Sequence, residues 1–204
     1  MRKIYKERNT FSFKNGFTLI ELLVVIGISS WLTTVIYTNF KETRETSSVL
    51  QAGLIQKEMT KATEKYFRDM GFYPPDVNRG WDPGFEQPVP WNPDVGQPGV
   101  PVVGIVCTHC PADWEDVVSE HWAGPYLNWP RETPWGGRFD YNYWSVSTTR
   151  SGGCVVPAGI YAGAQGDYQN SNTIPLSAED KMIEKGFDAD ECENGESQLL
   201  LWRL

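Results

Sequence analysis

The sequence predicts an α+β fold, in which a long N-terminal α-helix, half of it transmembrane, packs on a small antiparallel β-sheet head. Three observations carry this prediction: an apolar run over residues 17–40, an amphipathic pattern that follows it without a proline, and three strand-like segments near the C-terminus. The run of 24 residues exceeds the roughly 20 that a helix needs to cross a bilayer core. With 204 residues, the chain suits one compact domain with an appendage.

The apolar run contains one charge, Glu21, and follows a short basic leader that ends at Gly16. An acidic side chain costs about 2.5–3.5 kcal/mol at the centre of a membrane helix and less near the interface, so a charge here indicates a functional role and a partner. The leader, residues 1–16, has a net charge of +4, which leaves −12 for the rest of the chain. We therefore expect the leader in the cytoplasm and the head outside it. The acidic remainder argues against nucleic-acid binding.

An amphipathic stripe predicts that the helix continues beyond the apolar run. Apolar residues recur three or four positions apart, as on one face of a helix. They are Val49, Ala52, Ile55, Met59, Ala62, Tyr66 and Met70. Because no proline interrupts this part of the chain, we expect one helix from about Thr18 to about Met70, about 80 Å long. Gly71 supplies a C-terminal stop, and Pro74 prevents continuation.

The head is predicted to combine a long loop with a small sheet. Residues 74–123 are rich in proline, glycine and tryptophan, and we expect an ordered loop packed by its own aromatic side chains, with a short helix near residues 114–122. Segments 138–146, 159–164 and 198–202 are the expected antiparallel strands. The domain layout is then a leader (1–16), a hydrophobic helix (17–40), its amphipathic second half (41–71) and the head (72–204).

Four cysteines in an exported chain indicate two disulfides. Cys154 and Cys192 flank the final sheet, and a bridge closing about 39 residues contributes roughly 3–4 kcal/mol on the chain-entropy model. Three connectivities are possible, and we expect Cys107 and Cys110 to form the second, local pair. Zinc and redox chemistry are the alternatives for this Cys-x-x-Cys pair, although zinc needs further ligands and the other two cysteines are single and distant.

The N-terminal residues resemble the class III signal of type IV pilins and of type II secretion pseudopilins. The resemblance rests on Lys14, on the segment Gly16-Phe17-Thr18-Leu19-Ile20-Glu21 and on the apolar residues that follow. It implies that a prepilin peptidase cuts between Gly16 and Phe17 and methylates the new N-terminus at Phe17. It also implies that Glu21 pairs with the N-terminal amine of a neighbouring subunit and so sets the register of a filament.

Head motifs extend the resemblance to the major pseudopilin. Residues 71–74 (Gly-Phe-Tyr-Pro), 124–127 (Gly-Pro-Tyr-Leu) and 134–137 (Pro-Trp-Gly-Gly) match that family's segments around the end of the helix and before the sheet. Two positions depart from it: Thr133 replaces the usual aspartate, and Thr38 replaces a proline common in the first helix. The fold implied is the pilin-like ladle.

Calcium is the cofactor that the resemblance suggests, with no other cofactor expected. Major pseudopilins hold Ca²⁺ in a C-terminal loop region, and Asp167, Asp188 and Asp190 are the candidate ligands here. Carboxylates are suitable, since calcium takes 6–8 oxygen ligands. The alternative is an acidic loop that is simply solvated.

The chain contains no sequence motif of an enzyme active site. We expect a structural subunit of a type IV pilus-like filament, most similar to a major pseudopilin of type II secretion. Its expected partners are copies of itself, minor pilins or pseudopilins, the prepilin peptidase, and an inner-membrane assembly platform with its ATPase. It would begin as a single-pass inner-membrane protein and end in a periplasmic or cell-surface filament. The alternatives are a type IV pilin for adhesion, motility or DNA uptake, and a membrane-anchored ligand-binding module.

Overall fold

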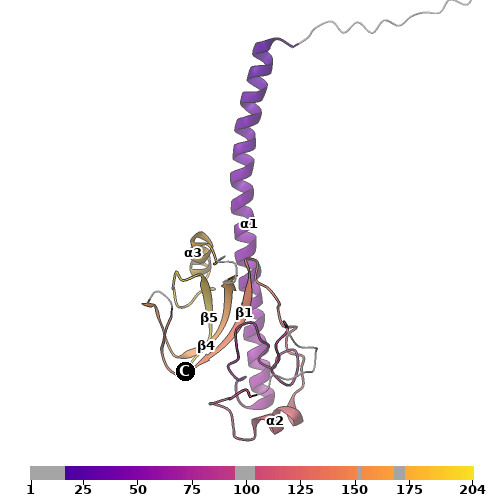
Figure 1. Ribbon diagram of the computed structural model, residues 1–204, viewed down its shortest axis with the longest axis vertical. Helices are drawn as coiled ribbons and strands as arrows, with labels where there is room; N and C mark the ends of the chain where they lie inside the picture. Colours follow the sequence, from indigo (N-terminus) through magenta and orange to yellow (C-terminus); the bar gives the residue numbers. More distant parts are fainter. Residues whose placement is uncertain (1–16, 95–103, 151–152, 168–172) are drawn as a thin grey trace, which may run out of the picture. The chain divides into compact units, whose positions relative to one another are not determined.

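The computed structural model describes residues 17–94, 104–150, 153–167 and 173–204, and it confirms the predicted α+β architecture (Figure 1). The chain divides into two compact units, one ending at Thr43 and one running from Arg44 to Leu204. The helices are α1 (Leu19–Met70), α2 (Trp114–His121) and α3 (Leu176–Glu184). The strands are β1 (Gly136–Trp144), β2 (Thr148–Thr149), β3 (Val155–Val156), β4 (Gly159–Gly166) and β5 (Glu196–Arg203).

The first unit contains the apolar half of α1. Among the described residues, α1 is the one helix long and apolar enough to cross a membrane, and its most apolar stretch has no buried residue. Hydroxyl groups within this half are satisfied internally: Ser30 donates to the carbonyl of Ile26, and Thr33 to that of Ser29. Thr38 donates to the carbonyl of Val35, and the helix continues through this position without a break. These polar residues are therefore compatible with an apolar environment.

The second half of α1 supplies the centre of the head. Six of the seven predicted stripe residues are buried, and Ile55 is half-buried. Sequence periodicity did not indicate Gln56, which is fully buried on the same face. Its Nε2 donates to the carbonyl of Ala162 on β4 at 2.9 Å and to Oγ of Ser197 on β5 at 3.1 Å. The helix is thus joined to two strands by hydrogen bonds as well as by apolar packing.

The main sheet has the order β1–β4–β5, with both pairs antiparallel, and lies beside this part of α1 (Figure 1). The three predicted strands all form, and each has slightly different bounds. Position 137 in β1 requires glycine, because a Cβ there would lie 2.1 Å from the carbonyl oxygen of Gln165. The sequence prediction missed two features: the short β2–β3 hairpin and α3.

The proline-rich loop packs by means of its aromatic residues, as predicted. Asp82 organises its first part, since its carboxylate accepts the backbone N–H groups of Gly84, Phe85, Glu86 and Gln87. This turn places Phe85 in the core, edge-on to Tyr66 of α1 and Tyr141 of β1. The predicted short helix is α2, and residues 95–103 of the loop lie outside the described residues.

Both predicted disulfides are confirmed. Cys107 is bonded to Cys110, and Cys154 to Cys192. Cys192 is buried in a small cluster with Val156 and Tyr161, so the longer bridge fastens the segment before β5 to β3 and β4. The terminal strand is thereby tied to the rest of the head.

Candidate assembly site

Glu21 lies in the first turn of α1, where it forms a reciprocal capping box with Thr18. Its Oε2 accepts the backbone N–H and the hydroxyl of Thr18, both at 2.8 Å. In return, the N–H of Glu21 donates to Oγ1 of Thr18 at 3.3 Å. The Thr-x-x-Glu spacing is a sequence signature of this cap, which the prediction of Glu21's role overlooked.

The capping box fixes the carboxylate beside the predicted cleavage point. Phe17, the residue before Thr18, is 85% exposed, whereas Gly16 lies outside the described residues. After cleavage, the new amino group would be on Phe17, at the end of the helix that carries Glu21. The site therefore places the Glu21 carboxylate four residues from the predicted new N-terminus.

Residues 12–37 match the family model of the prokaryotic N-terminal methylation motif. This motif includes Gly16, Phe17 and Glu21, and it supports a type IV pilin-like or pseudopilin subunit whose N-terminal helix anchors it in the membrane. No curated protein and no solved structure matches the chain. The match covers only residues 12–37, so the candidate sites in the head rest on the structure of the head alone.

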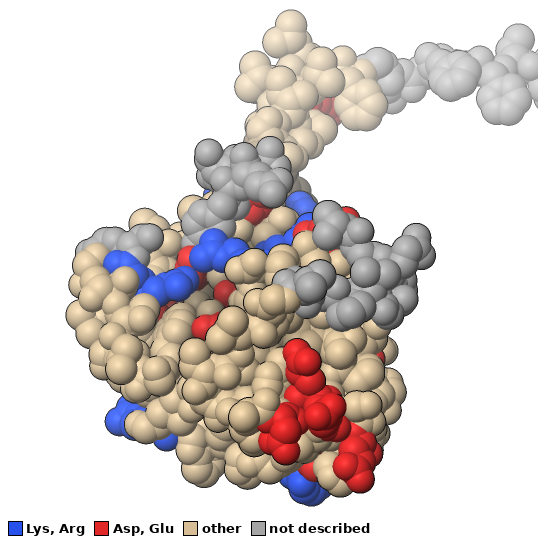
Figure 2. All heavy atoms as spheres, turned by 60° about the horizontal axis from the view of Figure 1, so that its bottom comes forward, with Lys and Arg blue, Asp and Glu red and all other residues tan. Residues whose placement is uncertain are grey.

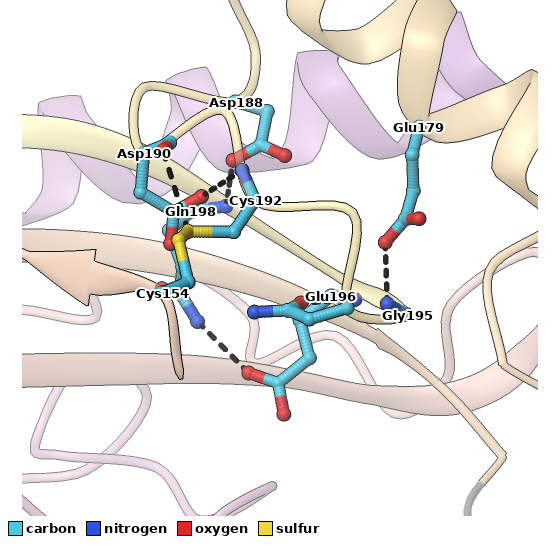
Figure 3. Close-up of a disulfide and its surroundings, with 9 residues drawn as sticks. Cys154, Glu179, Asp188, Asp190, Cys192, Gly195, Glu196 and Gln198 are labelled. Carbon is cyan, nitrogen blue, oxygen red and sulfur yellow. Dashed lines mark hydrogen bonds between the residues drawn. A yellow bond between two sulfur atoms is a disulfide. The ribbon is translucent and has the colours of Figure 1, made fainter. Parts of the chain in front are cut away.

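The acidic loop before β5 carries two of the three predicted calcium ligands. Asp188 and Asp190 lie beside each other next to the Cys154–Cys192 disulfide (Figure 3). Oδ1 of Asp188 accepts the N–H of Gln198 at 2.9 Å, and Oδ1 of Asp190 accepts that of Cys192 at 3.1 Å. The second carboxylate oxygen of each is buried and has no partner other than the neighbouring aspartate. Burial raises the pKa of Asp188, and the neighbouring Asp190 adds to this rise.

Asp167, the third predicted ligand, lies beside Gly136 at the start of β1. Within the described parts of the chain, the three aspartates do not converge as one group within 4.8 Å. Glu179 of α3 is a carboxylate that sequence reasoning missed: it is fully buried, and one of its oxygens accepts the N–H of Gly195 while the other has no partner (Figure 3). Burial raises the pKa of Glu179 to about 7.

A second group of potential metal ligands occurs in the Cys-x-x-Cys loop. The ligand atoms of Cys107, His109 and Cys110 lie within 4.8 Å of one another, although the two cysteines form a disulfide. His109 is half-buried and stacks on Tyr143 with 3.5 Å between ring centroids. Burial lowers the pKa of His109, which favours the neutral imidazole. The spacing of the two cysteines was visible in the sequence, but the position of His109 beside them follows from the conformation of the loop.

An apolar cavity of about 440 Å³ lies between the proline-rich loop and α2. Its lining includes Trp114, Val118 and Trp122 of the α2 segment and Pro88 and Pro90 of the loop. Figure 2 shows acidic side chains gathered on the face of the head that lies at the bottom of Figure 1, where α2 is found. The exposed acids of the α2 segment are Asp113, Glu115, Asp116 and Glu120. Such a face is unsuited to nucleic acid.

Proposed function

We propose that the chain is a structural subunit of a pilus-like filament, produced as a membrane-anchored precursor and cut between Gly16 and Phe17. The observation that carries this proposal is the methylation motif at the start of a helix whose first half is apolar and exposed. The large apolar residues from Phe17 to Phe40 are each at least 40% exposed. An apolar surface of this kind needs lipid or other protein chains around it. A membrane covers it in the precursor, and neighbouring helices cover it in the filament.

In this proposal, Glu21 is the residue that sets the register between subunits. Its carboxylate is held by Thr18, which satisfies part of its hydrogen-bonding capacity without neutralising its charge. Inside an apolar filament core, an unpaired charge costs several kcal/mol, so a cation must lie close to it. The N-methylated amino group of Phe17 on an adjacent subunit supplies that cation.

The filament that we favour is a type II secretion pseudopilus, because the head motifs resemble those of the major pseudopilin. Oη of Tyr126 donates to Asp69 in the last turn of α1 at 2.8 Å, and its ring packs edge-on to Tyr66. Thr133, which departs from the family pattern, donates to the carbonyl of Gln165 and accepts the N–H of Gly137. It thus organises the turn before β1 without a carboxylate.

The alternative is a surface pilus for adhesion, motility or DNA uptake. Neighbouring genes distinguish the two: a secretin and a secretion ATPase support the pseudopilus, and a retraction ATPase supports the pilus. The tryptophan-lined cavity beside α2 is the feature that favours a membrane-anchored ligand-binding module instead. That module would remain membrane-anchored and would form no filament.

Processing provides the direct test of the proposed function. Gly16→Leu should leave the leader attached, because the peptidase requires a small residue before the cut. Intact-mass spectrometry of the wild-type chain, expressed with a prepilin peptidase, should show a subunit that begins at Phe17 with one added methyl group. Gly27→Ala, at a helix position with nothing within 4 Å, is the matched control and should be processed normally. Normal processing of Gly16→Leu would contradict the proposal.

We also propose that Asp188 and Asp190 bind Ca²⁺. Their buried carboxylate oxygens, which have no partner besides each other, support this proposal, because a divalent cation would neutralise both groups. Ca²⁺ at about 100 times its dissociation constant would stabilise the head by about 2.7 kcal/mol. Chelation should therefore lower the melting temperature of the wild type but not of Asp188→Ala. Asp180→Ala, at an exposed position on α3, should respond like the wild type. A wild-type midpoint that is unchanged by chelation would contradict calcium binding.

A further inference from the structure

The Cys-x-x-Cys loop places an imidazole beside a disulfide. Nδ1 and Nε2 of His109 lie 3.6 and 3.5 Å from Sγ of Cys107, and one ligand atom from each of Cys107, His109 and Cys110 lies within 4.8 Å of the others. A tetrahedral zinc site has Zn–N bonds of about 2.0–2.1 Å and Zn–S bonds of about 2.3 Å, which puts nitrogen and sulfur about 3.6 Å apart. The imidazole is thus already as near to the Cys107 sulfur as a shared zinc ion requires, and opening of the disulfide must bring this sulfur into line with the lone pair of Nδ1.

The hydrogen bonds of His109 leave Nδ1 as the ring nitrogen that can bind a metal ion. Nε2 lies 3.1 Å from the carbonyl oxygen of Tyr73 and 3.0 Å from that of Pro74, so it carries the proton and donates. Nδ1 consequently presents its lone pair. Metal-binding histidines are oriented in this way, by a hydrogen bond from the second ring nitrogen to a carbonyl. Stacking on Tyr143 fixes the plane of the ring.

A polar cavity of about 350 Å³ adjoins His109. Its lining includes His109, Thr108, Tyr143 and Asp76. The cavity has room for a water molecule in a fourth ligand position. The cysteines themselves are half-buried, so a small reductant and a metal ion can both reach them.

We propose that reduction of the Cys107–Cys110 disulfide creates a Zn²⁺ site formed by two thiolates and Nδ1 of His109, with water from the adjacent cavity as the fourth ligand. A dithiol reductant supplies two electrons: its two thiols become a disulfide, and the Cys107–Cys110 bond breaks to give two thiols. Zn²⁺ then binds as both thiols release their protons. The sulfur atoms separate to about 3.8 Å, as two Zn–S bonds of about 2.3 Å in tetrahedral geometry require.

The redox state therefore determines metal binding. The disulfide holds the loop closed when the protein is oxidised, and no thiolate is then available as a ligand. Cys154 and Cys192 are not part of this site, because their bridge lies in a different cluster with Val156 and Tyr161. The two bridges can thus be distinguished experimentally.

The test uses the full-length chain in detergent micelles, reduced under mild conditions with a dithiol and desalted without oxygen. Alkylation and peptide mass spectrometry establish which bridge has opened. Competition with a chromophoric chelator then measures Zn²⁺ affinity, and Co²⁺ in place of Zn²⁺ reports thiolate ligands by its absorption spectrum. We expect one equivalent of Zn²⁺ in the protein with Cys107 and Cys110 reduced, and none in the oxidised protein.

Variants separate this site from unspecific thiol binding. Cys110→Ser should abolish uptake, and His109→Ala should weaken it at least about tenfold, the lower limit for losing even an outer-shell partner of a metal site. His121→Ala is the matched control, because His121 lies in the last turn of α2 and is no member of the group, and it should leave affinity unchanged. Circular dichroism checks that each variant is folded. Absence of uptake by the reduced wild type, or uptake that survives in Cys110→Ser, would overturn the proposal.

Discussion

The two halves of α1 belong to one helix, but the first half exposes its apolar side chains and the second half buries them. Before Thr43, the apolar side chains of α1 are exposed, and its hydroxyl groups bond to its own carbonyls. From Val49 to Met70, the helix buries one stripe against the loop and the sheet of the head. Both halves form one continuous helix, so the difference lies in what surrounds the side chains. The second half of the helix is therefore buried when the subunit folds, whereas the first half is buried only by a membrane or by other subunits.

This comparison separates folding from assembly. The head should depend on the second half of α1 for its stability, whereas assembly should depend on the first half. Paired substitutions of the same kind in each half can show whether the division holds.

The largest difference in head stability is expected between Met59→Ala and Ile28→Ala. Met59 is fully buried in the core, and removing its side chain should cost about 2–5 kcal/mol through lost burial and a residual cavity. Ile28 is 55% exposed in the first half, and its truncation should leave head stability unchanged. Near-ultraviolet circular dichroism of the detergent-solubilised chain during heating measures both. Equal destabilisation by the two variants would contradict the claim that only the second half of α1 stabilises the head.

A smaller difference is expected between Gly53→Ala and Gly27→Ala. A Cβ at residue 53 would come within 2.4 Å of the Phe187 ring, whereas one at residue 27 meets nothing within 4 Å. Crowding costs about 1–3 kcal/mol, and alanine returns about 1 kcal/mol in helix propensity. Gly53→Ala should therefore lower the free energy of unfolding by up to about 2 kcal/mol. In the same assay, Gly27→Ala should have no effect, and a stabilised Gly53→Ala would show that the Phe187 ring moves freely.

A third effect is a pH dependence of the stability of the head. Asp140 of β1 is buried, which raises its pKa to about 7, and Gln165 donates to its Oδ2 at 3.2 Å. A raised pKa in the folded state means that the protonated carboxyl stabilises the head below its unfolded pKa, near 4, and that this contribution is lost as pH rises through about 7. Melting temperatures should fall over this range, and less so in Asp140→Asn. An equally steep fall in the variant would assign the effect to other groups.

The sequence predicted the features of the head that follow from periodicity. The stripe on α1, the three sheet strands and α2 are regular patterns of apolar residues, and they form where expected. Gln56 and Glu179 escaped prediction because a buried polar side chain carries no apolar signal, and its partners come from distant parts of the chain. For the same reason α3, which is largely polar, was not expected.

The candidate sites divide in the same way. Phe17 and Glu21 could be named because their motif is local, and Cys154 could be paired with Cys192 because both flank the sheet. The calcium set was harder, since three aspartates near one another in the loops of a sequence need not converge, and Asp167 lies beside β1 instead. Spatial arrangement, rather than composition, decides such a site.

Cryo-electron microscopy of filaments purified from cells that produce this chain with its assembly machinery tests the central claim most directly. We predict that the first half of α1 forms the filament interior, with the carboxylate of Glu21 next to the Phe17 amino group of a neighbouring subunit. The processed Glu21→Val variant should yield few or no filaments, whereas Glu42→Gln, at an exposed position on the same helix, should assemble normally. Filaments in which the residues from Phe17 to Phe40 face solvent, or normal assembly of Glu21→Val, would contradict the account.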